Sequence, residues 1–298
     1  MRTARRSRVP VFLLMIVLGA VLVFLIKGKS DSAPEETPDP HAGQIYINDG
    51  FDMVWLTPWE GVETNDISRS ELRMVNDRPE YSGGAYYLRY GVDVSEHQWD
   101  IDWRQVASSG VDFAMIRLGY RGCTEGGLFE DPYYYKNMDG ALAAGLDVGV
   151  YFFSQALTVQ EAIEEAEYVI QRLKGYNVKM PVVFDWERVE ADYAVRSDNM
   201  DSTILTDCAV AFCQTVSNAG YDACVYFNRH FGYYEFDLSR LDRYQFWIAL
   251  PGEYPDFYYK CQLWQYSFSA SIPGIEGETD MNVQFVPVAA PAAETRTP

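Results

Sequence analysis

The chain has 298 residues, 48% of them hydrophobic and 15% aromatic, which is enough for one domain of about 200 residues with additional segments. Its net charge is −19, and residues 31–298 alone carry −25, because residues 1–30 hold six bases and no acid. A body this acidic argues against a nucleic-acid partner, since binding phosphates requires Lys and Arg to replace their counterions.

The first 43 residues differ from the rest of the chain. Residues 1–9 are basic, and residues 10–26 carry no charge over a length that just suffices for a membrane-spanning helix. No clear Ala-x-Ala cleavage site follows. We therefore predict a single-pass signal anchor with its N-terminus inside and the body extracytoplasmic, joined by a polar linker over residues 27–43. The alternative is a cleaved signal, which would give a secreted protein.

Residues 44–87 contain short aromatic runs broken by turn-forming residues, which predict a small β-rich extension. From Leu88 onward the pattern becomes regular, with five apolar strand-like runs separated by stretches of helical periodicity. Capping residues mark two of the helix starts: Asp131-Pro132 opens one, and Thr158 with Glu161 opens the next. The expected strands are 90–95, 112–120, 148–154, 181–187 and 223–228, and the expected helices are 101–109, 132–145, 158–175 and 202–218.

The last part of the chain changes character. Strand-like runs at 246–250, 261–267 and 281–286 are separated by only 10 and 13 residues. A parallel crossover needs a dozen residues or more, so these strands should be antiparallel or joined by bare loops. We predict an α/β fold: an irregular eight-stranded β/α (TIM-like) barrel over residues 88–287, with few helices in its second half and a disordered tail at 288–298.

Three acids fall where an α/β barrel forms its active site, at the carboxyl ends of strands. Asp93 lies in the first strand, and Asp185 and Glu187 end the fourth. Alternation places Asp185 and Glu187 on one face, with Trp186 on the other. Two close carboxylates raise each other's pKa, so one can stay protonated as a general acid, which glycoside hydrolysis requires. Spacing alone also fits two solvated acids, but the buried run before them favours the catalytic interpretation.

A family resemblance joins these segments. YGVDVSEHQWDIDW (90–103) and VVFDWE (182–187) resemble glycoside hydrolase family 25, the lysozymes or muramidases, and so do DFAMIRLGYRG, GVYFFSQA, FWIA, QLWQYS and Thr-Asp-Met-Asn (279–282), in the same order. The resemblance implies a barrel with a helix-poor second half that cleaves the β-1,4 bond between N-acetylmuramic acid and N-acetylglucosamine in peptidoglycan glycan strands. It assigns Glu187 as the general acid and Asp185 as its partner, with Asp93 and Asp280 completing an acidic quartet.

The role of Asp185 stays open. It could attack the sugar as a nucleophile, or it could orient the substrate's own 2-acetamido group for attack. A water-based inversion is the third possibility.

Residues near the strand ends are candidates for substrate binding. Aromatic rings could stack on sugar faces and polar groups could hydrogen-bond them, although core packing explains aromatic residues in a barrel equally well. His97 follows the first strand and could line the cleft, but the three His form no cluster, so we expect no metal and no cofactor. The candidate contacts are Tyr151, Phe153, Tyr226, Trp264, Gln265 and Arg117, the last of which could instead satisfy a buried carboxylate.

Three rival functions use the same features. The main one is a non-catalytic wall-binding protein on the same barrel, since a fold does not determine a function. Another is a chitinase-like glycosidase, and a third is a sensor or assembly protein that works through residues 44–87. The expected partners are peptidoglycan and, through the N-terminal helix, the membrane, with the protein acting as a monomer.

Overall fold

The computed structural model describes residues 39–288, so the predicted anchor, most of the linker and the predicted tail lie outside the described residues. The chain divides into two compact units, residues 1–43 and 44–298. Of the first unit only the turn at residues 39–43 is described. Within residues 39–288, no helix combines the length and the apolar character that crossing a bilayer requires.

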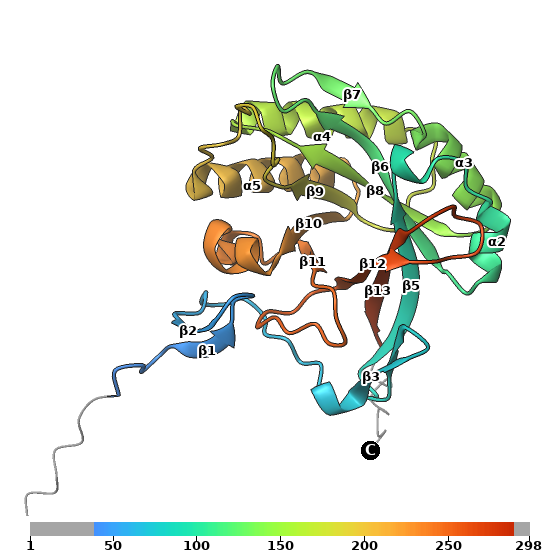
Figure 1. Ribbon diagram of the computed structural model, residues 1–298. Coiled ribbons are helices and arrows are strands. Elements are labelled where there is room, and N and C mark those ends of the chain that lie inside the picture. The colour runs from blue at the N-terminus through green and yellow to red at the C-terminus, as the bar shows by residue number, and fades with distance from the viewer. Residues whose placement is uncertain (1–38, 289–298) are drawn as a thin grey trace, which may run out of the picture. The chain divides into compact units, whose positions relative to one another are not determined.

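Eight strands of the second unit close into a barrel, which confirms the predicted fold (Figure 1). Around the ring they follow the order β5, β13, β12, β11, β10, β9, β8 and β6, and a pairing between β5 and β6 completes it. A short ninth strand, β7, which the sequence did not predict, pairs antiparallel with the end of β6. Their bounds are β5 Tyr86–Val94, β6 Phe113–Arg121, β7 Leu128–Glu130, β8 Asp147–Ser154, β9 Val182–Trp186, β10 Ala223–Asn228, β11 Gln245–Ala249, β12 Leu263–Ala270 and β13 Thr279–Pro287.

Only the last barrel strand is reversed. β13 is antiparallel to both of its neighbours, β12 and β5, whereas the other barrel pairs are parallel. β11 and β12 are parallel although residues 250–262, which connect them, contain no helix. Both expected solutions for the short connections therefore occur. A loop without a helix joins β11 to β12, and antiparallel pairing joins β12 to β13.

The helices cover the first half of the barrel. Figure 1 shows α3, α4 and α5 outside the strands from β6 to β10. Thr158 caps α4 as predicted, and the buried face of the helix includes the carboxyl of Glu165. After β10 the only helical elements of the described chain are the short π-helix η3 (Phe231–Glu235) and the short 3₁₀-helix η4 (Leu238–Arg240). The helices are α2 Trp103–Ser108, α3 Tyr134–Ala143, α4 Val159–Leu173 and α5 Ser202–Asn218.

The start of α3 differs from the predicted one. The helix begins at Tyr134, and Asp131 is not its cap. One carboxyl oxygen of Asp131 accepts the Tyr133 N–H, but the other accepts a 2.7 Å hydrogen bond from Arg117. A buried carboxylate needs a cationic partner, so the Asp131 side chain is committed to Arg117 in the barrel.

Alternation along the strands divides the core into two layers. Side chains on one face fill the barrel, and those on the other pack against the helices in a larger cluster. The interior leaves little space: a Cβ on Gly91 would lie 2.2 Å from the ring of Phe113. The interior layer consists of Phe113, Met115, Met180, Val183, Cys224, Trp247 and Leu263.

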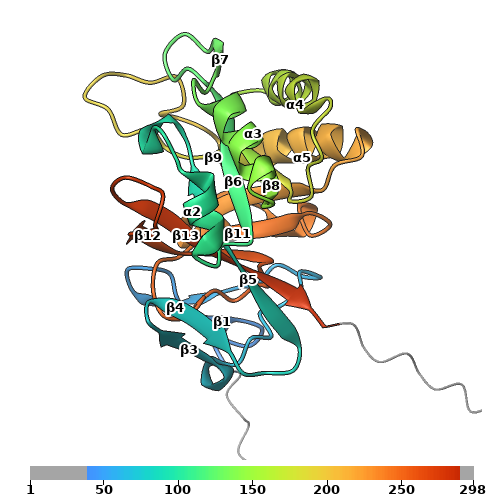
Figure 2. The ribbon, with the colours of Figure 1, turned by 90° about the vertical axis from the view of Figure 1, so that its right-hand side faces the viewer.

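Residues 44–85 pack on the part of the barrel that no helix covers. They form two hairpins, β1 (Ile45–Asn48) with β2 (Met53–Leu56) and β3 (Leu72–Val75) with β4 (Arg78–Tyr81), and Figure 2 shows the second one beside the start of β5. Between them the chain pairs with the loop at 250–262, where Asn65 N–H donates to the Tyr258 carbonyl and Lys260 N–H to the Glu63 carbonyl. Apolar side chains from this segment join the main core: Val62, Ile67 and Leu72.

Because Ile67 is buried in that core, we expect Ile67→Ala to lower the free energy of unfolding of the whole barrel by about 2–5 kcal/mol. Denaturant unfolding followed by tryptophan fluorescence measures this. Met53→Ala, at a half-exposed position of the same extension, is the control and should cost under about 1 kcal/mol. Equal, small effects of both changes would mean that the extension is not part of the barrel's cooperative unit.

Candidate active site

A pocket of about 240 Å³ opens at the carboxyl ends of the parallel strands. Each strand directs alternate side chains to the inside, so acids far apart in the sequence meet there. The lining residues are Asp93, Ser95, His97, Gln98, Arg117, Tyr151, Phe153, Asp185, Glu187, Tyr226, Trp247, Gln265 and Asp280. All four predicted acids are among them.

Asp185 and Glu187 occupy one wall of this pocket. Asp185 is buried within β9, and its Oδ1 has no hydrogen-bond partner. Glu187 follows the last residue of β9 and is exposed at the mouth. Trp186, between them, points to the outer layer and packs against Phe231 with ring centroids 5.8 Å apart. The arrangement offers one buried and one accessible carboxyl to the same substrate.

Asp93 and Asp280 occupy the opposite wall and are joined by amide groups. They face each other directly across the β5–β13 pair. The Gln265 amide donates to Asp93 Oδ2 at 2.9 Å and to Asp280 Oδ2 at 3.0 Å, and the Asn282 amide donates to Asp93 Oδ2 at 2.7 Å. Trp247 Nε1 in turn donates to Asn282 Oδ1 at 2.8 Å, which holds the amide in place.

Burial raises the pKa of all four acids, and the negative charges nearby raise it further for Asp185, Glu187 and Asp280. Burial raises the pKa of Asp93 to about 6, and burial together with Asp93 raises that of Asp280 to about 8. Burial, then the charges of Glu187 and Asp93, holds the pKa of Asp185 well above its usual range. The Glu187 carboxyl stands among the pocket walls although the residue is exposed, and partial desolvation raises its pKa. The Asp185–Glu187 pair therefore keeps a proton to higher pH than ordinary carboxyls do.

Arg117 is committed to other carboxylates. It donates from Nε to the buried Asp131 at 2.7 Å and from Nη2 to Glu96 at 2.8 Å. Arg117 was predicted either to contact the substrate or to satisfy a buried carboxylate, and these contacts fit the second role. Its side chain still lines the pocket.

Most predicted sugar contacts line the pocket, but Trp264 does not. Tyr151, Phe153, Tyr226 and Gln265 face the acids. Trp264 is fully buried in the outer layer, where its Nε1 donates to the Leu250 carbonyl at 2.7 Å. The reason is strand alternation, since neighbours in β12 cannot both face inward. We therefore withdraw Trp264 as a substrate contact.

Trp247 and Asn282 were missed by the sequence analysis. Trp247 lies edge-on to both Tyr226 and Tyr151, with ring centroids 4.8 Å and 6.2 Å away. Asn282 could have been found by alternation, because it stands two residues after Asp280 on the same strand. Trp247 belongs to none of the predicted acidic motifs, so only the fold reveals its position.

A buried amide holds the backbone at Glu187. Gln155, just after β8, donates from Nε2 to the Glu187 carbonyl at 2.8 Å. Its Oε1 accepts from Ser197 Oγ at 2.5 Å, across the loop that follows Glu187. The Gln155 side chain thus links the backbone of Glu187 to Ser197 in the loop that follows β9.

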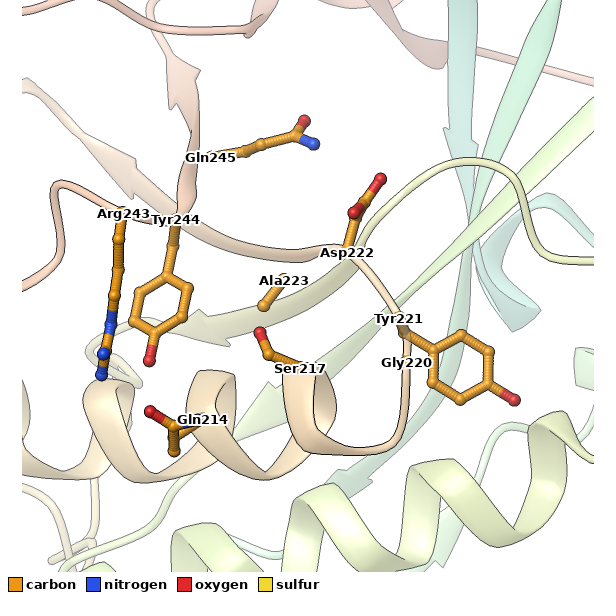
Figure 3. A pocket seen from close by; sticks show the side chains of 9 residues that line it. All are labelled: Gln214, Ser217, Gly220, Tyr221, Asp222, Ala223, Arg243, Tyr244 and Gln245. Carbon is orange, nitrogen blue, oxygen red and sulfur yellow. The ribbon is translucent and has the colours of Figure 1, made fainter.

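A larger pocket, of about 420 Å³, lies at the opposite, amino end of β10 and β11 (Figure 3). Side chains of α5 such as Gln214 and Ser217 line it, together with Asp222 and Arg243. Asp222 is its only acid, so it lacks the paired carboxyls that acid–base chemistry would use. Volume therefore does not identify the active site in this chain, whereas the grouping of acids does.

A barrel with paired carboxyls at its mouth is the architecture of barrel glycoside hydrolases. The chain belongs to glycosyl hydrolases family 25, whose family model matches residues 92–275. The autolytic lysozyme of Clostridium acetobutylicum is 29% identical over 194 residues, or 64% of this chain and 54% of that protein. Lysozyme M1 of Streptomyces globisporus is 26% identical, with 94% of this chain and 92% of that protein covered.

Solved structures agree with this assignment. The modular autolysin LytC from Streptococcus pneumoniae, in complex with a synthetic peptidoglycan ligand, aligns with a TM-score of 0.57 at 25% identity, covering 81% of this chain and 56% of that one. A family 25 glycosyl hydrolase from Bacillus anthracis shares the fold with a TM-score of 0.56 at 23% identity, covering 73% and 94%. This chain thus spans about half the length of LytC and of the Clostridium relative.

Proposed function

We propose that the protein is a peptidoglycan hydrolase of the lysozyme (N-acetylmuramidase) type, which cleaves the β-1,4 bond between N-acetylmuramic acid and N-acetylglucosamine. The observation that carries this proposal is the Asp185–Glu187 pair, two carboxyls with raised pKa values in a pocket that also holds Asp93 and Asp280. Its family membership and the lysozymes among its relatives support it.

The test is mass spectrometry of the muropeptides that the protein releases from purified peptidoglycan. A muramidase leaves N-acetylmuramic acid at the new reducing end. Fragments ending in N-acetylglucosamine would contradict the proposed bond, and intact peptidoglycan would contradict hydrolysis altogether.

Glu187 acts as the general acid in the proposed reaction. Exposed at the mouth, it can reach the glycosidic oxygen and give it a proton as the bond to the anomeric carbon breaks. Asp185 Oδ1, which is buried without a hydrogen-bond partner, is free either to attack the anomeric carbon or to accept the N–H of the substrate's 2-acetamido group. In the second case the acetamido oxygen is the nucleophile.

Both of these roles for Asp185 give retention of configuration, because each involves two displacements at the anomeric carbon. We therefore expect proton NMR of the reaction to detect the β-anomer of the new reducing end first. An α-anomer as the first product would contradict both roles and support direct attack by water.

The raised pKa values predict the direction of the pH dependence. The acid must be protonated to act, so kcat/KM should be highest on the acidic side and fall as pH rises through the raised pKa of the pair. The native state also binds more protons than the unfolded chain at these carboxyls, so its free energy of unfolding should fall over the same range. Rates and melting temperatures from about pH 4 to about pH 9 measure both. Activity that increases from neutral to alkaline pH would contradict this assignment of protons.

We also propose that residues 10–26 anchor the protein in the cell membrane with the barrel outside. The uncharged run and the basic residues before it support this orientation. The protein should then pellet with membranes, and deletion of residues 1–30 should release it. A mature protein that starts after about residue 30 would instead favour a cleaved signal.

One copy of the chain suffices for the proposed reaction, because the described residues alone supply all four carboxyls. We therefore propose that the protein acts as a monomer. Light scattering of the full chain in detergent would test this, and a stable dimer would contradict it.

A further inference from the structure

The first hairpin exposes an aromatic face. Alternation turns Ile45 and Ile47 inward and leaves Tyr46 and Trp55 exposed, at 54% and 42% of their surface. These two are paired across the strands, with ring centroids 4.9 Å apart. Met53 on the same face is half exposed too. Large apolar side chains gathered on a surface commonly mark a binding site.

A groove of about 450 Å³ lies beside this face. β1 forms one side of it, and residues 254–258 form the other. Its lining combines aromatic rings with amide, hydroxyl and carboxyl groups, for example Tyr46, Asn48, Asn65 and Asp256. A pyranose ring matches such a surface, because its C–H faces pack on aromatic rings while its hydroxyl and N-acetyl groups need hydrogen-bond partners.

The hairpin is connected to the catalytic rim of the barrel. In the turn between β1 and β2, Asp49 accepts a 2.8 Å hydrogen bond from the hydroxyl of Tyr234. The next residue, Glu235, forms a 3.0 Å ion pair with Arg188, which directly follows Glu187. The aromatic face therefore belongs to the same side of the barrel as the proposed proton donor.

The catalytic pocket is too small to hold a glycan strand by itself. At about 240 Å³ it is below the usual size of a small-molecule site, whereas the proposed substrate is a polymer. The remaining sugars must lie on the outer surface. We propose that the Tyr46–Trp55 face and its groove bind the glycan strand beyond the cleaved bond, an inference that rests on the proposed function.

Charge favours a glycan over a lipid surface as the occupant. Asp49 and Asp52 stand in the hairpin turn beside the aromatic rings. Anionic lipid head groups attract Lys and Arg and are repelled by carboxylates. Sugar hydroxyls, by contrast, are neutral donors that carboxylates accept well.

The test compares the full-length protein with its Tyr46→Ala/Trp55→Ala double variant, both in detergent. We expect the ratio of the rate on purified sacculi to the rate on a soluble N-acetylglucosamine–N-acetylmuramic acid tetrasaccharide to fall about tenfold in the double variant. In the Glu187→Gln background, sacculus binding should weaken by a similar factor. Circular dichroism melting checks that the variant is folded, as expected for two exposed positions.

Tyr87→Ala is the matched control, because Tyr87 is as exposed as Tyr46 (53% against 54%) but lies at the amino end of β5. The Tyr87→Ala variant should have the same ratio of the rate on sacculi to the rate on the tetrasaccharide as the wild type. An unchanged ratio and unchanged binding in the double variant would overturn the inference while hydrolysis by the wild type still supports the proposed function. Failure of the wild type on both substrates would instead remove the proposed function.

Membrane binding by the same face would also overturn the inference. It can be tested with full-length protein in vesicles of phosphatidylcholine and phosphatidylglycerol that carry brominated acyl chains. Quenching of tryptophan fluorescence that disappears in the Trp55→Phe variant would assign the face to the lipid surface. Quenching that is the same in both proteins leaves the glycan as its occupant.

Discussion

Glu187→Gln should slow hydrolysis of purified peptidoglycan by about 10²–10⁴-fold, the usual contribution of a general acid, without lowering the melting temperature. Gln has the size of Glu but has no acidic proton to give to the leaving oxygen. The position is exposed, so the amide does not create a buried unpaired group. Initial rates of muropeptide release, together with thermal unfolding, measure the two effects.

Glu190→Gln provides the matched control for this variant. Glu190 is another exposed acid in the loop that follows β9, and it does not line the pocket. Its replacement should leave the rate within about twofold of wild type. A Glu187→Gln protein with a rate close to that of the control would remove Glu187 as the proton donor.

Arg121→Met should lower the free energy of unfolding by about 3–5 kcal/mol, because it leaves a buried carboxylate without its cation. Arg121 and Glu165 are both buried, with Nε and Oε1 2.7 Å apart, and Ser154 Oγ donates to the other carboxyl oxygen at 2.6 Å. Burial already raises the pKa of Glu165 to about 7. Without Arg121 that pKa should rise further.

The destabilisation by Arg121→Met should therefore depend on pH. A group whose pKa is raised in the folded state stabilises it fully below its unfolded pKa, and this contribution is lost as pH rises. Arg121→Met should therefore lower the free energy of unfolding more near pH 8 than near pH 5, where the Glu165 carboxyl can take up a proton. Urea unfolding at the two values measures the difference.

The double variant Arg121→Met/Glu165→Gln tests the cause. The introduced amide keeps an oxygen that can accept from Ser154 but carries no charge, so most of the stability should return. If the double variant were as unstable as the single one, or if the loss were equal at both pH values, the effect would come from packing rather than from an unpaired charge.

Local patterns predicted the first half of the fold well. The helix at 202–218 and the strand at 223–228 occur with the predicted bounds, because an amphipathic helix and a short buried strand each have a strong periodic signal. β7 was missed because three residues are too few to show a period. Asp131 has the sequence of a helix cap, but its ion pair with Arg117 is a tertiary contact that no local pattern reveals.

The sequence predicted which acids face the pocket, but it was a poorer guide to the aromatic residues. Asp185 and Glu187 could be placed because alternation after a buried strand determines which face they share. For Trp264 and Gln265 the face depends on which residue of β12 points inward, and apolar residues occupy both sides of a barrel strand. The amide bridge from Gln265 to Asp93 and Asp280 depends on pairing between strands nearly two hundred residues apart, which one sequence does not contain.

The position of the last strand determines when the active site can first exist. β13 closes the ring by pairing with β12 on one side and with β5 on the other, and it carries both Asp280 and Asn282. Until residues 279–287 have been synthesised, β5 has no partner on that edge, and Asp93 lacks the amide of Asn282. A nascent chain that has not yet reached these residues therefore cannot assemble the acidic quartet, and the proposed hydrolase gains its activity against the wall only once β13 has been made.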